Sequence, residues 1–208
     1  KAGAAVYVGH HPRNITGADW IVRSSAVTED NPEVKAAKKS GIPVYRRSDF
    51  LGRLMEEKIG IAIAGTHGKT TTTAMTAWVL TKLNRDPSFI VGGVVNDLGV
   101  NAHAGAGSAF VIEADEYDNM FLGLKPQIAI VTSIEHDHPD VFPTLESTYH
   151  AFEKFVDLLP EEGTLIVCAE DQGAMALIPH VRKAGRDVVS YGVQGDMTIN
   201  TPYWIQAH

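Results

Sequence analysis

The stretch IGIAIAGTHGKTTTTAM, residues 59–75, constrains the fold of this chain more than any other segment. A run of apolar and small residues leads into Gly65, and the pattern Gly-x-x-Gly-Lys-Thr then ends at Thr70. A buried strand, a tight glycine turn and a helix start together present free backbone N–H groups to an anion. Lys69 would add a charge for the outer phosphates of a nucleotide, and Thr70 would place its hydroxyl on Mg²⁺.

An alternative to this phosphate loop is a glycine turn that only caps a helix and leaves Lys69 in solvent. The common phosphate-loop pattern has a glycine five residues before Gly68, and that position is Ile63. The strand-like run before the turn and the helix-like TTTTAMTAWVL after it favour the phosphate loop. Threonine is a poor helix former, so four in succession indicate that hydroxyl groups matter here. Capping or packing explains residues 71–73 equally well.

Strands and helices alternate along the chain, which is typical of an α/β fold with a largely parallel sheet. We expect strands at residues 4–8, 20–25, 42–45, 59–64, 88–93, 109–114, 127–133, 163–169 and 187–192. We expect helices at residues 30–41, 48–58, 69–84, 144–160 and 171–184, and a glycine-rich loop at 92–107. A domain boundary near Glu57–Ile59 would divide the chain into residues 1–57 and 58–208.

Composition excludes several classes of protein. The net charge is −7 and no basic cluster exceeds two residues, which argues against a nucleic-acid partner. No apolar run approaches the ~20 residues that span a bilayer, so we expect no membrane insertion. The single cysteine, Cys168, excludes an intramolecular disulfide framework and fits a reducing compartment such as the cytoplasm.

The segment AFVIEADEYD, residues 109–118, supplies the first candidate metal ligand. Glu113 ends an apolar strand, where a carboxylate would lie beside the phosphate loop of a parallel sheet. Carboxylate oxygens are ligands that Mg²⁺ prefers. A solvated acidic loop describes Asp115, Glu116 and Asp118 better than a ligand role does.

The segment IAIVTSIEHDHPD supplies the second group of candidates, just past another buried strand. It carries Glu135, His136, Asp137, His138 and Asp140. Two histidines at i and i+2 are compatible with zinc, but no third soft ligand stands at a familiar spacing. A polar loop at a strand end, without a ligand, stays an alternative reading.

Together, AGTHGKTTTTAM, EADEYD and SIEHDHPD resemble the Mur ligase family, ATP-dependent enzymes that form amide bonds in bacterial peptidoglycan synthesis. The resemblance covers almost the whole chain. It implies that residues 1–57 are part of a Rossmann-like UDP-substrate domain and that residues 58–208 are the central P-loop-type ATPase domain. Family members also have a C-terminal Rossmann-like domain. We therefore expect a piece of a longer cytoplasmic protein, which alone binds ATP weakly and catalyses no ligation.

The resemblance also assigns site residues. It implies that the ATP phosphates are held by Gly65, Thr66, His67, Gly68, Lys69, Thr70 and Thr71. Thr70 and Glu113 would bind one Mg²⁺ and His138 a second, and Lys69, Glu113 and His138 would be the catalytic residues. His136 is then an extra residue that faces solvent. Lys154 is a weak counterpart of a carbamylated lysine found in some relatives.

Gly9-His10 and Ser24-Ser25 end two predicted strands of the UDP-substrate domain. By the same resemblance they would touch the uridine or the diphosphate. Capping and turn roles are equally compatible with these residue types.

The N-terminal block resembles the family member that adds the first amino acid, which implies UDP-N-acetylmuramate and L-alanine as substrates and an acyl-phosphate intermediate. A ligase that recycles murein tripeptide is an alternative, because Tyr117 is common at its matching position. MFLGLKP, after this tyrosine, looks more like the alanine-adding member. The N-terminal block disfavours a folylpolyglutamate synthase. A nucleotide-binding module without chemistry is a further alternative, against which the acidic loops argue.

Overall fold

The computed structural model describes residues 3–193 and 195–198, and the chain forms two compact units, Lys1–Leu51 and Gly52–His208. The assignment of UDP-substrate and ATPase domains to residues 1–57 and 58–208 stays a prediction. Across the described ranges, no helix has the length and apolar character that crossing a membrane requires.

The first unit contains η1 (Pro12–Ile15), β1 (Ile21–Arg23), α1 (Pro32–Lys39) and β2 (Val44–Arg46), with β1 parallel to β2. Asn31 caps α1, because its side chain accepts hydrogen bonds from the N–H groups of residues 33 and 34. The predicted strand at 4–8 is wrong. Val6 and Val8 are 87% and 104% exposed, and a run of β-prone residues forms no strand without a neighbour to pair with.

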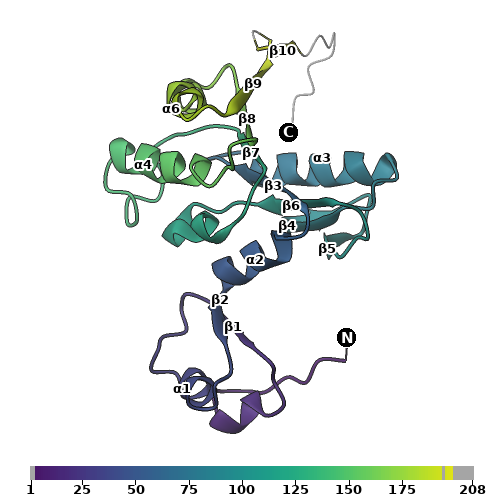
Figure 1. Ribbon diagram of the computed structural model, residues 1–208, viewed down its shortest axis with the longest axis vertical. Coiled ribbons are helices and arrows are strands. Elements are labelled where there is room, and N and C mark those ends of the chain that lie inside the picture. The colour runs from purple at the N-terminus through teal and green to yellow at the C-terminus, as the bar shows by residue number, and fades with distance from the viewer. Residues whose placement is uncertain (1–2, 194, 199–208) are drawn as a thin grey trace. The chain divides into compact units, whose positions relative to one another are not determined.

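The second unit is built on one largely parallel sheet, as predicted (Figure 1). Within the described residues its strand order is β10-β9-β8-β7-β3-β6-β4-β5, and only β5 runs antiparallel to its neighbour. The strands are β3 (Ile59–Ala64), β4 (Ser88–Val95), β5 (Val100–His103), β6 (Ala109–Glu113), β7 (Ile128–Val131), β8 (Thr164–Cys168), β9 (Asp187–Gly192) and β10 (Met197–Thr198).

Part of the predicted glycine-rich loop at 92–107 is in fact a hairpin. β4 continues to Val95, and β5 returns antiparallel to it. The N–H groups of Leu98 and Gly99 donate to the Val95 carbonyl at 2.9 and 2.8 Å, and Gly99 has a φ of +70°. Glycine adopts this left-handed conformation at little cost, so it closes the turn.

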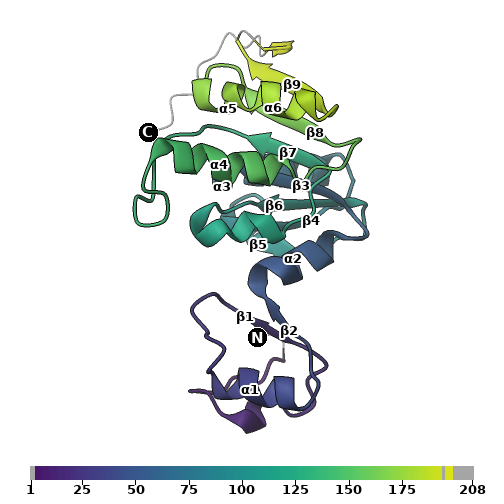
Figure 2. The same cartoon turned by 60° about the vertical axis from the view of Figure 1, so that its left-hand side comes forward.

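Helices cover both faces of the sheet. α2 (Arg47–Met55) leads from the first unit into the second. α3 (Lys69–Lys82) covers one face, whereas the other carries η2 (Tyr117–Gly123), α4 (Leu145–Val156), α5 (Gln172–Ala176) and α6 (Ile178–Lys183), as Figure 2 shows from a second side. The single helix predicted at 171–184 is wrong: Pro179, which lacks an N–H group, lies in the first turn of a separate α6.

A layer of apolar side chains lies on each side of the sheet. Under α3, the buried residues are Ile63, Ala77, Phe89, Val91, Val95 and Val111. On the opposite face, Phe121 of η2 stacks on Phe155 of α4, with ring centroids 4.9 Å apart and planes 8° from parallel. Phe121 is 1% exposed, so η2 is held firmly against the core although it follows an acidic loop.

Candidate active site

The sheet topology places the Gly-Lys-Thr turn at the centre of one sheet edge. β3 lies between β6 and β7, and all three are parallel, so their carboxyl ends share this edge. Gly65 leaves β3 with a φ of +139°, and a Cβ there would lie 2.0 Å from Thr132 Oγ1. Only glycine fits that position. Gly68, with a φ of +79°, then starts α3 at Lys69.

The segment that follows β7 braces the loop. The N–H groups of Thr66 and His67 donate to the carbonyl and the Oγ of Ser133 at 2.9 and 3.2 Å. The N–H group of Glu135 donates to Thr66 Oγ1 at 2.9 Å, and Thr132 Oγ1 donates to the His67 carbonyl at 2.5 Å. The first N–H groups of α3 lack intrahelical acceptors, as at any helix start. With the loop braced, these N–H groups in the first turn of α3 are the ones that an anion could accept from.

The threonines that follow Lys69 have different roles. Thr70 is exposed and faces Glu113, with its Oγ1 2.9 and 3.0 Å from the two carboxylate oxygens. Thr71 is exposed and lines the cavity over the loop. Thr73 is fully buried, and its Oγ1 donates to the Lys69 carbonyl at 2.7 Å. Thr70 and Thr71 are thus available to a ligand, whereas Thr73 packs inside the fold.

Lys69 folds back over its own loop and contacts a buried carboxylate. Its Nζ lies 2.7 Å from the Gly65 carbonyl, 3.4 Å from the Thr66 carbonyl and 3.0 Å from Glu116 Oε1. Glu116 is 3% exposed, so the sequence-based reading of this residue as part of a solvated loop is wrong. Burial raises the pKa of the Glu116 carboxyl, although the Lys69 ammonium acts in the opposite direction.

Glu113 and Thr70 form the oxygen-rich side of the site. Besides Thr70, the carboxylate of Glu113 accepts a hydrogen bond from the N–H group of Gly92 at 2.8 Å. A Cβ at Gly92 would lie 2.6 Å from Glu113 Oε2, so glycine is needed there for the carboxylate to take this position. Hydroxyl and carboxylate oxygens suit Mg²⁺, which often takes few protein ligands and completes its shell with water and phosphate.

His138 lies past the end of β7, the other neighbour of β3. It has a φ of +52°, and its ring packs edge to face on Tyr117 with centroids 5.3 Å apart. Tyr117 also donates to Asp140 at 3.4 Å. In the described part of the chain, no three His, Cys, Asp or Glu side chains cluster closely enough to hold a metal among themselves. It therefore stays a prediction that Thr70 and Glu113 bind one metal ion and that His138 binds a second.

The remaining candidates of the two loops have local partners. His136 is exposed, as expected, and its Nε2 bonds to the Phe142 carbonyl at 2.9 Å. Asp115 is exposed and accepts the N–H group of Tyr117 at 3.1 Å. The side chain of Asp118 lies outside the described residues. Lys154 lies exposed in the last turn of α4.

In the first unit, His10 and Ser24 make local contacts. His10 Nδ1 lies 3.0 Å from Glu33 Oε2 of α1. The Ser24 carbonyl accepts the N–H group of Val27 at 3.1 Å, which forms a turn. These contacts agree with capping and turn roles, and a contact to uridine or diphosphate stays a prediction.

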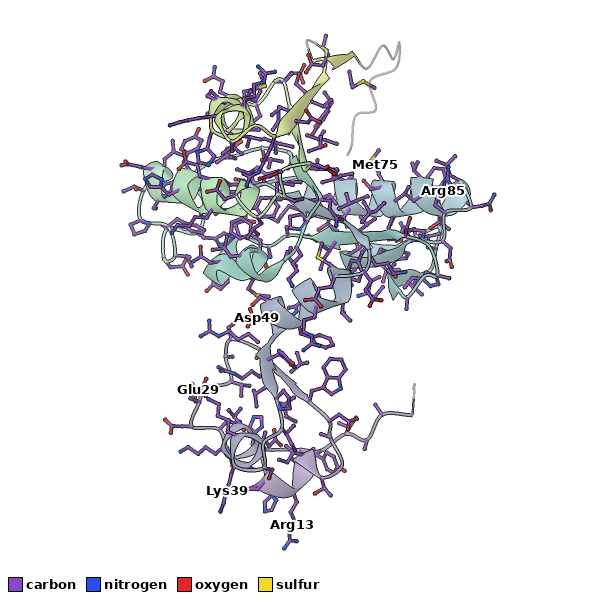
Figure 3. All side chains as sticks on the ribbon, viewed as in Figure 1. Arg13, Glu29, Lys39, Asp49, Met75 and Arg85 are labelled. Carbon is purple, nitrogen blue, oxygen red and sulfur yellow. The ribbon has the colours of Figure 1, made fainter. Side chains whose placement is uncertain are left out.

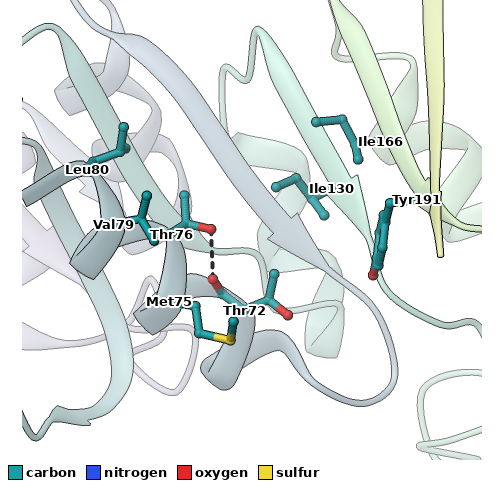
Figure 4. A pocket seen from close by; sticks show the side chains of 8 residues that line it. All are labelled: Thr72, Met75, Thr76, Val79, Leu80, Ile130, Ile166 and Tyr191. Atoms are coloured by element: carbon teal, nitrogen blue, oxygen red, sulfur yellow. Dashed lines mark hydrogen bonds between the residues drawn. The ribbon is translucent and has the colours of Figure 1, made fainter. Parts of the chain in front are cut away.

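Two cavities lie along α3. One, of about 330 Å³, covers the phosphate loop, and its lining includes Lys69, Thr70 and Glu113. The other, of about 460 Å³, lies between α3 and β7–β9 and has a mostly apolar lining (Figure 4). Met75, labelled in Figure 3, is 63% exposed at this second cavity. Burial raises the pKa of Tyr191 at this cavity to about 12. Only the first cavity has the charges that a polyphosphate needs.

Comparison with known proteins gives the family of this chain. The family model described as the Mur ligase middle domain matches residues 63–206, and that described as the Mur ligase family, catalytic domain, matches residues 1–59. The chain belongs to the Mur ligase family.

Named relatives of this Mur ligase chain include members with two specificities. It is 48% identical over 190 residues to UDP-N-acetylmuramate–L-alanine ligase of Renibacterium salmoninarum, covering 91% of this chain and 41% of that protein. A solved UDP-N-acetylmuramate–alanine ligase from Thermotoga maritima is 30% identical, with a TM-score of 0.70, over 93% of this chain and 43% of that one.

A second solved relative acts on a peptide substrate. This is UDP-N-acetylmuramate:L-alanyl-γ-D-glutamyl-meso-diaminopimelate ligase from Neisseria meningitides, which is 29% identical with a TM-score of 0.75. That match covers 89% of this chain and 62% of the other. The present chain spans about two fifths of the length of curated relatives that it matches, UDP-N-acetylmuramate–L-alanine ligases among them.

Proposed function

We propose that the protein is a cytoplasmic ATP-dependent ligase that joins L-alanine to the lactyl carboxyl group of UDP-N-acetylmuramate. The observation that carries this proposal is the phosphate loop of β3, set between Glu113 on β6 and the His138 segment after β7. The chain is also 48% identical to a relative named UDP-N-acetylmuramate–L-alanine ligase. A polyphosphate, a hard cation and an attacking carboxylate would meet at this one edge.

In the proposed reaction, the first turn of α3 and Lys69 bind the phosphates of ATP. The substrate carboxylate attacks the γ-phosphorus, the bond to the bridging oxygen breaks, and ADP leaves. The amine of alanine then attacks the carbonyl carbon of the acyl phosphate. The tetrahedral intermediate loses phosphate and a proton to give the amide. Lys69 lowers the repulsion between carboxylate and triphosphate, so its contribution is electrostatic and positional.

Thr70 and Glu113 are the residues that would hold one Mg²⁺, and His138 would hold a second. When bound, such ions neutralise charge that builds up on the transferred phosphoryl group. Without a ligand, Glu113 is kept in place by Thr70 and by the N–H group of Gly92. The carboxylate is therefore oriented before a cation arrives, which reduces the reorganisation needed on binding.

The recycling of a murein peptide is a second candidate with specific support. Tyr117 packs on His138 within the site, and tyrosine is the residue expected for that specificity. The solved peptide-specific relative also has a TM-score of 0.75 to this chain, against 0.70 for the solved alanine ligase. The 48% identity to the curated alanine ligase outweighs this difference, because both solved relatives are near 30% identical.

A substrate panel tests the proposal on the full-length protein. UDP-N-acetylmuramate, ATP and Mg²⁺ are supplied with L-alanine, glycine, L-serine or murein tripeptide. Phosphate release and product mass are then measured. We expect L-alanine to give the highest kcat/KM and a product heavier by one alanine residue. Preference for the tripeptide would establish the second candidate. Nucleotide binding without phosphate release from any acceptor would establish a module without chemistry.

A further inference from the structure

The feature that the proposed chemistry leaves unused is the carboxylate of Glu116. This side chain is 3% exposed and lies directly beside a site that binds anions. It cannot simply move away, because Glu116 immediately precedes η2, and Phe121 of η2 is stacked on Phe155 in the core. A buried carboxylate needs another group, of opposite charge, as its partner, and beside a polyphosphate site such a group is one that the phosphates also require.

That other group is Lys69. Its ammonium has three N–H bonds and three acceptors: two loop carbonyls and Glu116 Oε1. A phosphate oxygen that binds Lys69 must therefore displace or share one of these acceptors. Glu116 is the only charged one of the three.

The environment of Glu116 makes this exchange unfavourable for the protein. Among the described atoms, Oε2 of Glu116 is buried and has no hydrogen-bond partner. If Lys69 turns toward a phosphate, the carboxylate loses its cation while it stays out of water. Breaking a buried ion pair in this way is strongly unfavourable, because one charge is left uncompensated.

We propose that Glu116 holds Lys69 against the phosphate loop and competes with the nucleotide for it, so that Glu116 lowers the nucleotide affinity of the site. This inference rests on the nucleotide binding in the proposed function and not on the identity of the amino acid that is joined. Glu116 is a positioning residue that acts through Lys69, in contrast to Glu113, which faces Thr70.

The test compares Glu116→Gln with the matched variant Asp115→Asn in the full-length protein. Both remove one carboxylate charge, but Asp115 is exposed and does not contact Lys69. The Kd of a non-hydrolysable ATP analogue with Mg²⁺ is measured by calorimetry. We expect Glu116→Gln to bind about tenfold more tightly, because the ammonium is released from a neutral amide and not from a buried charge. Asp115→Asn should change Kd by less than about twofold, because water and salt screen its charge.

The sign of the effect separates competition from a merely structural role. A side chain that only supported the loop would weaken binding when changed, whereas a competitor strengthens it. Glu116→Asp keeps the charge and should not bind more tightly than wild type. Glu116→Ala serves if the glutamine variant does not fold, and it should also bind more tightly. Equal or weaker binding by the folded neutral variants would overturn the inference.

Failure of the proposed function gives a different result. A wild-type protein that binds the analogue but forms no product with any acceptor would remove the ligase proposal and leave this inference intact. A wild-type protein that forms the product, but whose Glu116→Gln variant has an unchanged Kd, would support the ligase proposal and overturn this inference. A wild-type protein that binds no nucleotide would overturn both.

Discussion

The polar atoms at the start of α3 are already paired before any ligand binds. Lys69 contacts Glu116, and Thr70 contacts Glu113. Pairing keeps Thr70 and Glu113 near the positions that a nucleotide and its cation require, which lowers the entropic cost of ordering them on binding, whereas it holds Lys69 back from the phosphates. It also couples function to stability, because removing one partner leaves the other without its contact.

Lys69→Ala tests this coupling. We expect phosphate release in the full-length protein to fall to background while the far-UV circular dichroism is unchanged. The free energy of unfolding should drop by about 3 kcal/mol, because Glu116 is left buried without a cation. The double variant Lys69→Ala/Glu116→Gln should recover much of that stability in urea denaturation, but no turnover. Near-normal phosphate release from folded Lys69→Ala would contradict the role given to the lysine.

The pH dependence of stability gives an independent test of the buried carboxyl. The pKa of Glu116 is raised above its ordinary value of 4.5, so the folded protein binds this proton more tightly than the unfolded chain does. Stability from this group is therefore present at low pH and is lost as pH rises from 4.5 through the raised pKa.

Glu116→Gln removes that titration. Urea denaturation between pH 4.5 and pH 7 should show the variant gaining stability relative to wild type, at up to about 1.4 kcal/mol per pH unit within the window. Asp115→Asn is the control: it keeps Glu116, whose pKa the Asp115 charge helps to raise, so any gain in its stability should be smaller than that of Glu116→Gln. A difference between Glu116→Gln and wild type that does not change with pH would show that the carboxyl does not titrate in this range.

Residue types and spacing predicted Lys69, Thr70 and Glu113 as neighbours because parallel strands bring their carboxyl ends together. They did not predict the pairing of Glu116. Three acidic residues of one loop, Asp115, Glu116 and Asp118, look alike in sequence, and the packing of η2 is what buries Glu116. The sequence did contain one signal for this burial, the apolar residues Phe121 and Leu124. They are 1% and 4% exposed, and their packing in the core places the loop before them against it.

At the scale of elements, β4 supports the site although it is separated from β3 by β6. Its Gly92 donates to Glu113, whereas a Cβ at the adjacent Gly93 would lie 3.6 Å from Thr70 Cγ2, an ordinary contact. Gly92 and Gly93 are therefore a matched pair for substitution. A Cβ would collide with the Glu113 carboxylate at Gly92 but would fit at Gly93.

Gly92→Ala should displace the Glu113 carboxylate and raise the Mg²⁺ concentration for half-maximal phosphate release by about tenfold, which is typical when a group that orients a ligand is lost. Gly93→Ala should leave it within about twofold of wild type. Thermal unfolding of both variants checks that β4 still forms. An equal effect of both substitutions would indicate damage to the strand and not to Glu113.

Hydrophobic patterning predicted the parallel strands and α3 well, because buried strands of α/β folds read as apolar runs. It failed where pairing or chain-breaking decides the structure. Residues 4–8 have strand composition but no partner, β5 is a short exposed strand, and Pro179 divides the last predicted helix. The local propensity of a segment does not tell whether a neighbouring strand is available to pair with it.

At the scale of the whole molecule, the phosphate-loop residues and their braces all belong to the unit Gly52–His208. We expect residues 47–208, which keep α2 intact, to bind Mg²⁺ and an ATP analogue with a Kd within about threefold of that of residues 1–208. We expect no UDP-N-acetylmuramoyl-L-alanine from either piece, because residues 1–208 match only 41% of the length of the named alanine ligase and closure over an acyl phosphate must exclude water. Calorimetry and mass spectrometry measure the two outcomes, and product formation by either piece would contradict the second.

The bracing of the phosphate loop by Ser133 and Glu135 also has a consequence for biosynthesis. The loop at residues 65–68 leaves the ribosome well before its braces, which follow 66 and 69 residues behind their partners. At 5–20 residues per second, that interval lasts roughly 3 to 14 s. During it, β3 also lacks β7 at its side, because that strand is not yet made. We expect a nascent chain to bind nucleotide only once the neighbouring strand and the braces after it are in place, so binding would report that the centre of the sheet has formed.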